Sequence, residues 1–174
     1  MDLSRLKWIP LAVYVAWLVI AYEFHFLDFV NLAFHEAGHI FLSPFGTTLG
    51  MLGGTIGQLV FPIACAIHFL RLGQLTSALV CGVWLAESLM YVAHYMADAR
   101  EMTLPLVGGE IHDWNWLFGR LGWLEASEGL AAAVHVLASL LAVALVFALA
   151  RISRQESLAT SEPPHLPEGA QIER

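Results

Sequence analysis

The feature that most constrains this chain is a long apolar run near its C-terminal end, residues 129–150, which contains no formally charged side chain. A helix needs about 20 mostly apolar residues to cross the hydrocarbon core of a membrane, so this run predicts a transmembrane helix. The composition agrees, because 58% of the 174 residues are hydrophobic and only 13% are charged, whereas soluble domains have about a quarter charged. The sequence therefore predicts an all-α integral membrane protein in contact with the lipid bilayer.

Four segments are apolar enough to predict spanning helices, and a fifth is shorter. The four are residues 8–27, 55–70, 75–97 and 125–150. The fifth, residues 29–44, is followed by residues 45–54, which are too rich in glycine to predict a good helix. We expect about four transmembrane helices plus a short re-entrant helix over the fifth segment, with a polar loop over residues 98–122.

Basic residues predict how these segments are oriented, because lysine and arginine favour the cytoplasmic side of a membrane. If residues 29–54 dip into the membrane and return to the same side, the basic residues that flank the predicted helices all lie on one side. These residues are Arg5, Lys7, Arg71, Arg151 and Arg154. We therefore expect both termini in the cytoplasm and a membrane-embedded domain over residues 1–150. Residues 151–174 are rich in Pro, Glu and Ser and are predicted to form a disordered tail.

The short segment 29–44 contains the HExxH motif His35-Glu36-Ala37-Gly38-His39. On a helix, positions i and i+4 lie on one face about 6 Å apart, so the two imidazoles can bind one metal ion. Glu36 projects beside them, where it can take a proton from a metal-bound water. Ionisable residues inside membrane segments are costly, which favours a functional site over a structural polar cluster. The motif predicts a Zn2+ site with His35 and His39 as ligands and Glu36 as the catalytic base.

A third ligand is expected from the segment 75–97 or from the loop that follows it. Four polar residues recur there at offsets of 3 or 4, on one face of a helix: Glu87, Tyr91, His94 and Asp98. Asp98, at the membrane edge, is the first choice for the third ligand. His94 is either a ligand or a neighbour that orients one. His112 and Asp113 in the loop remain alternatives, as ligands or as substrate-binding residues.

Other polar residues in the apolar segments are given lesser roles. Gln58 and Glu87 are kept as candidate site residues or as partners of the ligands. His135, in the last apolar helix, is predicted to be a hydrogen-bonded packing residue. Cys65 and Cys81 are too few for a disulfide framework and are predicted to be buried thiols.

These motifs resemble the site-2 protease family of intramembrane zinc metalloproteases. The likeness rests on residues 34–39, on the glycine-rich segment with Gly53-Gly54 and Gly57-Gln58, and on stretches that are similar to a short bacterial branch of the family, residues 91–100, 104–106 and 108–109. The resemblance implies an enzyme of a bacterial inner membrane that cleaves membrane-embedded peptide segments. It implies His35 and His39 as zinc ligands and Glu36 as general base. The family's third ligand is an aspartate in a segment ending in Leu-Asp-Gly, which this sequence lacks, so the resemblance does not assign it.

Three functions are weighed for such a site, and we favour the first. An intramembrane zinc protease would hydrolyse a membrane-protein or peptide substrate with a metal-activated water. A di-iron oxygenase would need carboxylates and histidines from several facing helices, and a metal transporter would use the polar residues as an ion path. The net charge of −7 and the lack of a basic stripe argue against a nucleic-acid partner. The sequence makes no prediction of the oligomeric state.

Overall fold

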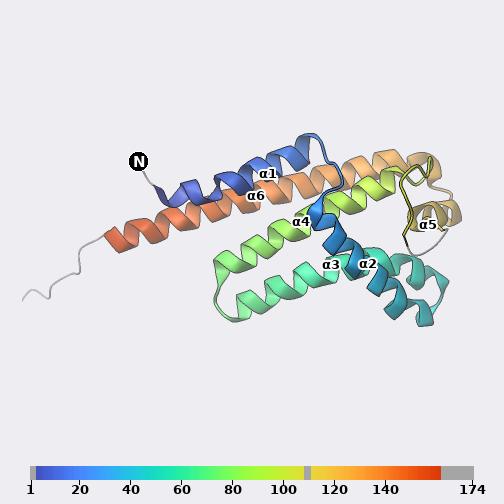
Figure 1. Ribbon diagram of the computed structural model, residues 1–174, viewed down its shortest axis with the longest axis horizontal. Helices are drawn as coiled ribbons and strands as arrows, with labels where there is room; N and C mark the ends of the chain where they lie inside the picture. The colour runs from blue at the N-terminus through green and yellow to red at the C-terminus, as the bar shows by residue number, and fades with distance from the viewer. Residues whose placement is uncertain (1–2, 108–110, 162–174) are drawn as a thin grey trace, which may run out of the picture.

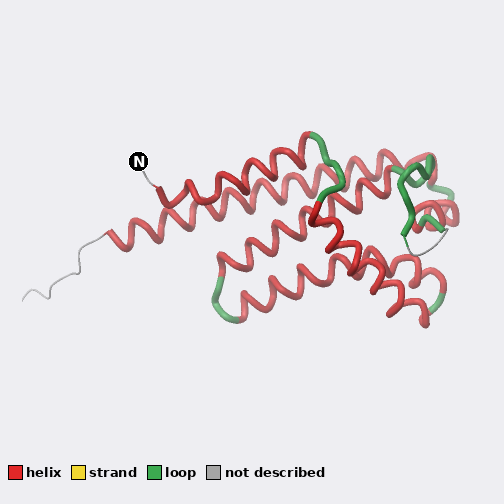
Figure 2. The backbone as a smooth tube through the Cα atoms, viewed as in Figure 1, coloured by secondary structure: helices red, strands yellow, loops and turns green. Residues whose placement is uncertain are grey.

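The computed structural model describes residues 3–107 and 111–161 (Figure 1). This part of the chain consists of α-helices, short 3-10 helices and connecting turns, and it contains no strand (Figure 2). The α-helices are α1 (Ile9–Ile20), α2 (Phe26–Leu42), α3 (Thr47–Arg71), α4 (Leu75–Ala97), α5 (Asp113–Leu121) and α6 (Ser127–Ser161). The predicted all-α fold is confirmed.

Three helices in the described part are long and apolar enough to cross a membrane, where the sequence predicted about four. They are α3, α4 and the helical segment Leu124–Leu158, which contains most of α6. α4 packs along α6 on one side and against α3 on the other, and α2 packs on α3 (Figure 1). The main apolar core lies between α1, α4 and α6 and includes Val15, Leu18, Ala86, Met90, Ala138 and Ala142.

The predicted first span, residues 8–27, is wrong, because α1 ends at Ile20. At about 1.5 Å per residue, the 12 residues of α1 extend about 18 Å and the 17 residues of α2 about 25 Å, both short of a hydrocarbon core of about 30 Å. α1 runs along α6 from the N-terminal end, and α2 continues from the middle of the molecule to the opposite end (Figure 1). α2 thus continues in the direction of α1. It does not form the predicted re-entrant helix, in which residues 29–54 would enter the membrane and return to the same side. His135 of α6 donates to the carbonyl of Val19 in the last turn of α1 (3.2 Å), which confirms its packing role.

The glycine-rich residues 45–54 are helical for most of their length, contrary to prediction, since α3 begins at Thr47. Gly46, with a φ of 113°, makes the turn before the helix. On the face of α3 that meets α2, glycines recur at helical spacing, at Gly50, Gly53, Gly54 and Gly57. A Cβ at Gly38 of α2 would overlap the carbonyl oxygen of Gly53. The close packing that only glycine permits offsets the low helix propensity of this stretch.

Two segments predicted to be irregular contain helix. The loop predicted over residues 98–122 includes the 9 residues of α5, and Gly122, in a left-handed conformation (φ 71°), caps the end of this helix. The predicted disordered tail begins at residue 151, but α6 continues to Ser161. Residues 162–174 of that tail, like residues 108–110 of the loop, lie outside the described residues.

Replacing Gly38 with Ala is expected to destabilise the protein, since the new methyl group would overlap the backbone at Gly53. Overpacking of this kind costs about 1–3 kcal/mol of unfolding free energy. Gly129→Ala is the matched control, because a Cβ at this α6 glycine meets nothing within 4 Å. Chemical unfolding of both variants in detergent micelles, followed by circular dichroism, measures the difference. Equal stability of the two variants would contradict the close α2–α3 contact.

Candidate metal centre

Helix α2 carries a polar stripe along the face that it turns into the bundle. Asp28, Asn31, His35 and His39 follow one another at helical spacing, and the first three are buried. The helix begins at this stripe, because the Asp28 carboxylate accepts a hydrogen bond from the backbone N–H of His25 (2.8 Å) in a capping box. The polar side chains of α2 therefore find their partners inside the protein.

α3 supplies the two acceptors that orient the histidine rings of the HExxH motif. His39 Nδ1 lies 2.7 Å from the backbone oxygen of Gly50, and His35 Nδ1 lies 3.0 Å from Gln58 Oε1. A carbonyl oxygen only accepts, so Nδ1 of His39 carries a proton. Gln58 donates through Nε2 to the Ser88 carbonyl (3.2 Å), which leaves its Oε1 facing His35. Both rings are therefore held with a proton on Nδ1 and with Nε2 pointing away from α3's acceptors.

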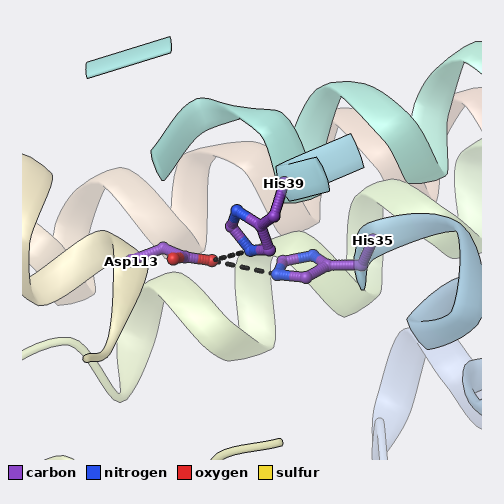
Figure 3. A group of neighbouring side chains, drawn as sticks. All are labelled: His35, His39 and Asp113. Carbon is purple, nitrogen blue, oxygen red and sulfur yellow. Dashed lines mark hydrogen bonds and ion pairs between the residues drawn. The ribbon is translucent and has the colours of Figure 1, made fainter. Parts of the chain in front are cut away.

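Asp113, at the start of α5, meets both histidines at their free nitrogens (Figure 3). Its Oδ2 lies 2.9 Å from His35 Nε2 and 3.1 Å from His39 Nε2. Burial by itself raises the pKa of Asp113, but the hydrogen bonds and the charge of the two histidines outweigh it and hold the pKa below its usual value. With Nδ1 protonated, each neutral ring directs an Nε2 lone pair at an anionic oxygen. The three groups therefore attract one another only when cations lie among them, either a second proton on each ring or one metal ion.

The donor atoms of this group fit a zinc ion. His35, His39 and Asp113 each offer one ligand atom, and these atoms all lie within 4.8 Å of one another. Zinc binds imidazole nitrogen and carboxylate oxygen, and catalytic zinc sites use three protein ligands with a further position open. Hydrogen-bond acceptors behind the Nδ1 atoms, as on α3, are the usual support for histidine ligands. We therefore treat the group as a candidate metal centre.

The segment before α5 is anchored so that Asp113 reaches the histidines. The backbone N–H of Asp113 donates to Tyr95 Oη on α4 (3.3 Å). His112 stacks on the Tyr95 ring with 4.1 Å between ring centroids, and its Nδ1 accepts from the backbone N–H of Asn115 (3.3 Å). Asn115 in turn donates through Nδ2 to the carbonyl of Ala99 (2.8 Å). His112 thus acts on the site by holding its neighbour in place, and it is not among the converging ligand atoms.

The ligand atoms lie at the wall of a cavity of about 1000 Å³. Glu36 lines the same cavity beside His35 and His39. Much of the remaining lining is apolar or aromatic and includes Phe24, Phe29, Leu32, Met51, Leu106 and Ile111. The cavity therefore joins a carboxylate and a metal-ligand set to an apolar surface.

Asp98, the sequence's first choice for the third ligand, is not part of the converging group. It follows the last turn of α4, and its Oδ1 accepts hydrogen bonds from the backbone N–H and the hydroxyl of Thr103 (2.8 and 2.6 Å). Its Oδ2 accepts from the backbone N–H of Leu104 (3.0 Å) and lies 3.4 Å from His112 Nε2. These contacts stabilise the turn after α4. The alternative from the loop, Asp113, is the aspartate that the fold brings to both histidines.

The remaining candidates are divided between the cavity and the bundle interior. His94 lines the cavity but is outside the group of ligand atoms, and Gln58 is the acceptor described above. Glu87 is only 1% exposed and belongs to a second polar group, with His25 and Asp28. His25 and Asp28 are not among the site residues predicted from the sequence. Asp28 lies two helical turns before the HExxH motif on the same face, which was the available signal.

Comparison of the chain with protein-family models, with curated proteins and with solved structures found no match. The geometry of the site and the resemblance of its motif are therefore what bear on function. The geometry defines a candidate metal centre of two histidines and one aspartate beside a glutamate, in a protein whose described part has three helices long and apolar enough to span a membrane.

Asp113→Asn is expected to remove one equivalent of bound zinc, because it takes the negative charge from the point where the two Nε2 atoms meet. Asp98→Asn is the matched control and is expected to retain that zinc, since Asp98 bonds to the turn at Thr103. Metal content of both purified variants, measured by mass spectrometry after exposure to zinc and removal of the excess, tests the assignment. Loss of zinc in Asp98→Asn with retention in Asp113→Asn would contradict it.

Proposed function

We propose that this protein is a membrane-embedded, zinc-dependent peptidase. The observation that carries the proposal is the convergence of His35 Nε2, His39 Nε2 and Asp113 Oδ2 at the wall of a cavity that Glu36 also lines. A metal-ligand set and a base are the parts that a zinc hydrolase needs, and their presence on the wall of one space large enough for a substrate supports the proposal. The resemblance of the HExxH segment to the site-2 protease family favours the same reaction.

Each residue of the site has a definite task in peptide hydrolysis. A zinc ion held by the two histidines and the aspartate would supply a water of lowered pKa and an electrophile for the peptide carbonyl. Glu36 accepts a proton from the attacking water and returns it to the leaving amine. Gln58 and the Gly50 carbonyl keep both rings in the tautomer that leaves Nε2 free.

The lining of the cavity indicates an apolar substrate. A segment of a membrane protein has apolar side chains that match Phe24, Phe29, Leu32, Met51 and Ile111. Its backbone must be unwound at the bond to be cleaved, since the carbonyl oxygens of a helix already accept hydrogen bonds. Residues 104–107, which have no regular secondary structure, also line the cavity and leave one wall free of helix.

The proposed orientation places the N-terminal end, the α3–α4 turn and the C-terminal part of α6 in the cytoplasm. These three segments lie toward the same end of the molecule (Figure 1). Trp8 Nε1 donates to Ser153 Oγ (2.8 Å), which joins two of them. They carry the basic residues Lys7, Arg71, Arg151 and Arg154. The metal centre then lies toward the non-cytoplasmic side, where α2 ends and α5 lies. The tandem of α1 and α2 replaces the re-entrant helix in this orientation and still keeps the basic segments together.

Glu36→Gln is expected to keep zinc and to lower the cleavage rate by about 10²–10⁴-fold, the usual contribution of a general base. The substitution is isosteric, and Glu36 is outside the converging ligand atoms. Cleavage of a pool of single-span membrane peptides, reconstituted with zinc-loaded protein and followed by mass spectrometry, provides the assay. Glu101→Gln, at an exposed position after α4, is the control and is expected to cleave like the wild type. Unchanged cleavage in Glu36→Gln, or no cleavage by the zinc-loaded wild type of any peptide in the pool, would count against the proposal.

A further inference from the structure

A second cluster of polar side chains lies where the end of α1 and the start of α2 meet the middle of α4. Asp28 and Glu87 are 0% and 1% exposed, and they lie together with His25. Each of the three offers one ligand atom, and these atoms are all within 4.8 Å of one another. Two carboxylates buried side by side repel each other unless a proton is shared between them or a cation lies among them.

Asp28 is well satisfied and orients the histidine. Its Oδ2 accepts from the backbone N–H of His25 (2.8 Å) and lies 2.7 Å from His25 Nδ1, while its Oδ1 accepts from the hydroxyl of Tyr22. His25 Nδ1 also lies 3.1 Å from the carbonyl oxygen of Glu23. Nδ1 therefore faces acceptors only and carries a proton. The other ring nitrogen, Nε2, accepts a hydrogen bond from the Tyr14 hydroxyl (2.5 Å) and lies 3.8 Å from Glu87 Oε1, so a cation bound at Nε2 would replace the Tyr14 proton.

Glu87 presents a buried oxygen that accepts no hydrogen bond from a donor among the described residues. Its Oε2 accepts from Asn31 Nδ2 (2.9 Å), and Asn31 is fixed in that direction because its Oδ1 accepts from Trp84 Nε1 (2.8 Å). Glu87 Oε1 is buried without a hydrogen bond and lies 3.8 Å from His25 Nε2. A buried carboxylate oxygen with no donor is costly, so a ligand that satisfies it is called for.

The charge of the cluster indicates what that ligand is. Among the described residues, His25 is the only basic side chain that forms an ion pair with Asp28 or Glu87. A divalent cation balances two carboxylates and accepts the lone pair of an imidazole nitrogen.

We propose that His25, Asp28 and Glu87 bind a divalent metal ion, at a second site separate from the HExxH centre. Asp28 precedes His35 by seven residues on α2, which is about 10 Å along the helix, so the two sites do not form a binuclear centre. The second metal ties the junction of α1 and α2 to the middle of α4. This inference does not depend on the proposed peptidase activity.

The test uses the full-length protein in detergent, exposed to zinc alone and freed of excess by gel filtration. In a His35→Ala/His39→Ala variant, which lacks the first centre, about one zinc ion per chain is expected to remain. Addition of Glu87→Gln, which keeps an oxygen for Asn31 but removes the charge, is expected to abolish it. Addition of Glu128→Gln, whose side chain is 67% exposed, is the matched control and is expected to leave it.

Three results would overturn the second site. The first is the absence of zinc from the His35→Ala/His39→Ala variant. The second is zinc that remains bound when Glu87→Gln is added to that variant. The third is an infrared band of a protonated carboxyl group that is present in the zinc-loaded protein and disappears with Glu87→Gln. The last result would mean that the carboxylates share a proton. Gel filtration and circular dichroism report whether Glu87→Gln remains folded. If it does not, cobalt added to the His35→Ala/His39→Ala variant gives the answer, since visible absorption by bound cobalt supports the site and its absence overturns it. If the HExxH centre does not bind zinc, the result is different: the wild type and the His35→Ala/His39→Ala variant then contain the same amount of zinc.

Discussion

The close approach of α2 and α3 is the contact on which the site depends. Gly38 meets Gly53 so closely that a Cβ on either residue would collide with the other backbone, and a Cβ at Gly54 would overlap the ring of His35. At this distance the Gly50 carbonyl and Gln58 reach the Nδ1 atoms of the two motif histidines. The glycine contact between α2 and α3 therefore brings an acceptor to each Nδ1 atom and keeps a proton there. Both Nε2 atoms are then free to point toward Asp113.

The site is completed from a part of the chain that is distant in sequence. Asp113 is 78 positions from His35 and is delivered by a short helix that is fastened to the end of α4. The chain thus separates two tasks. The closely packed α2–α3 pair carries the histidines and Glu36, and the α4–α5 connection adds the carboxylate and one wall of the cavity. The second polar cluster fastens the start of α2 to α4, at the other end of the same polar stripe.

The sequence predicted those features that depend on local pattern. Hydrophobic runs identified α2, α4 and most of α3 and α6, and the spacing of His35 and His39 identified the motif. The helical state of residues 47–54 was not predictable from propensity, because the packing that stabilises these glycines comes from α2. Asp113, and not Asp98, converges on the two histidines, because the backbone N–H groups of Thr103 and Leu104 donate to the Asp98 carboxylate in the turn after α4. The periodicity of the sequence does not predict this turn. The break between α1 and α2 lies where Glu23 and His25 interrupt the apolar run, and these two residues were the available signal that the first helix ends before Leu27.

Anomalous diffraction at the zinc absorption edge from crystals of the zinc-loaded protein would locate the metal and identify its ligands. The account predicts a peak about 2.0–2.2 Å from His35 Nε2, His39 Nε2 and an Asp113 carboxylate oxygen, with the Nδ1 atoms still bonded to Gly50 and Gln58. A zinc ion held by Asp98 in place of Asp113, or the two histidines bonded directly to Asp113 with no peak between them, would contradict it.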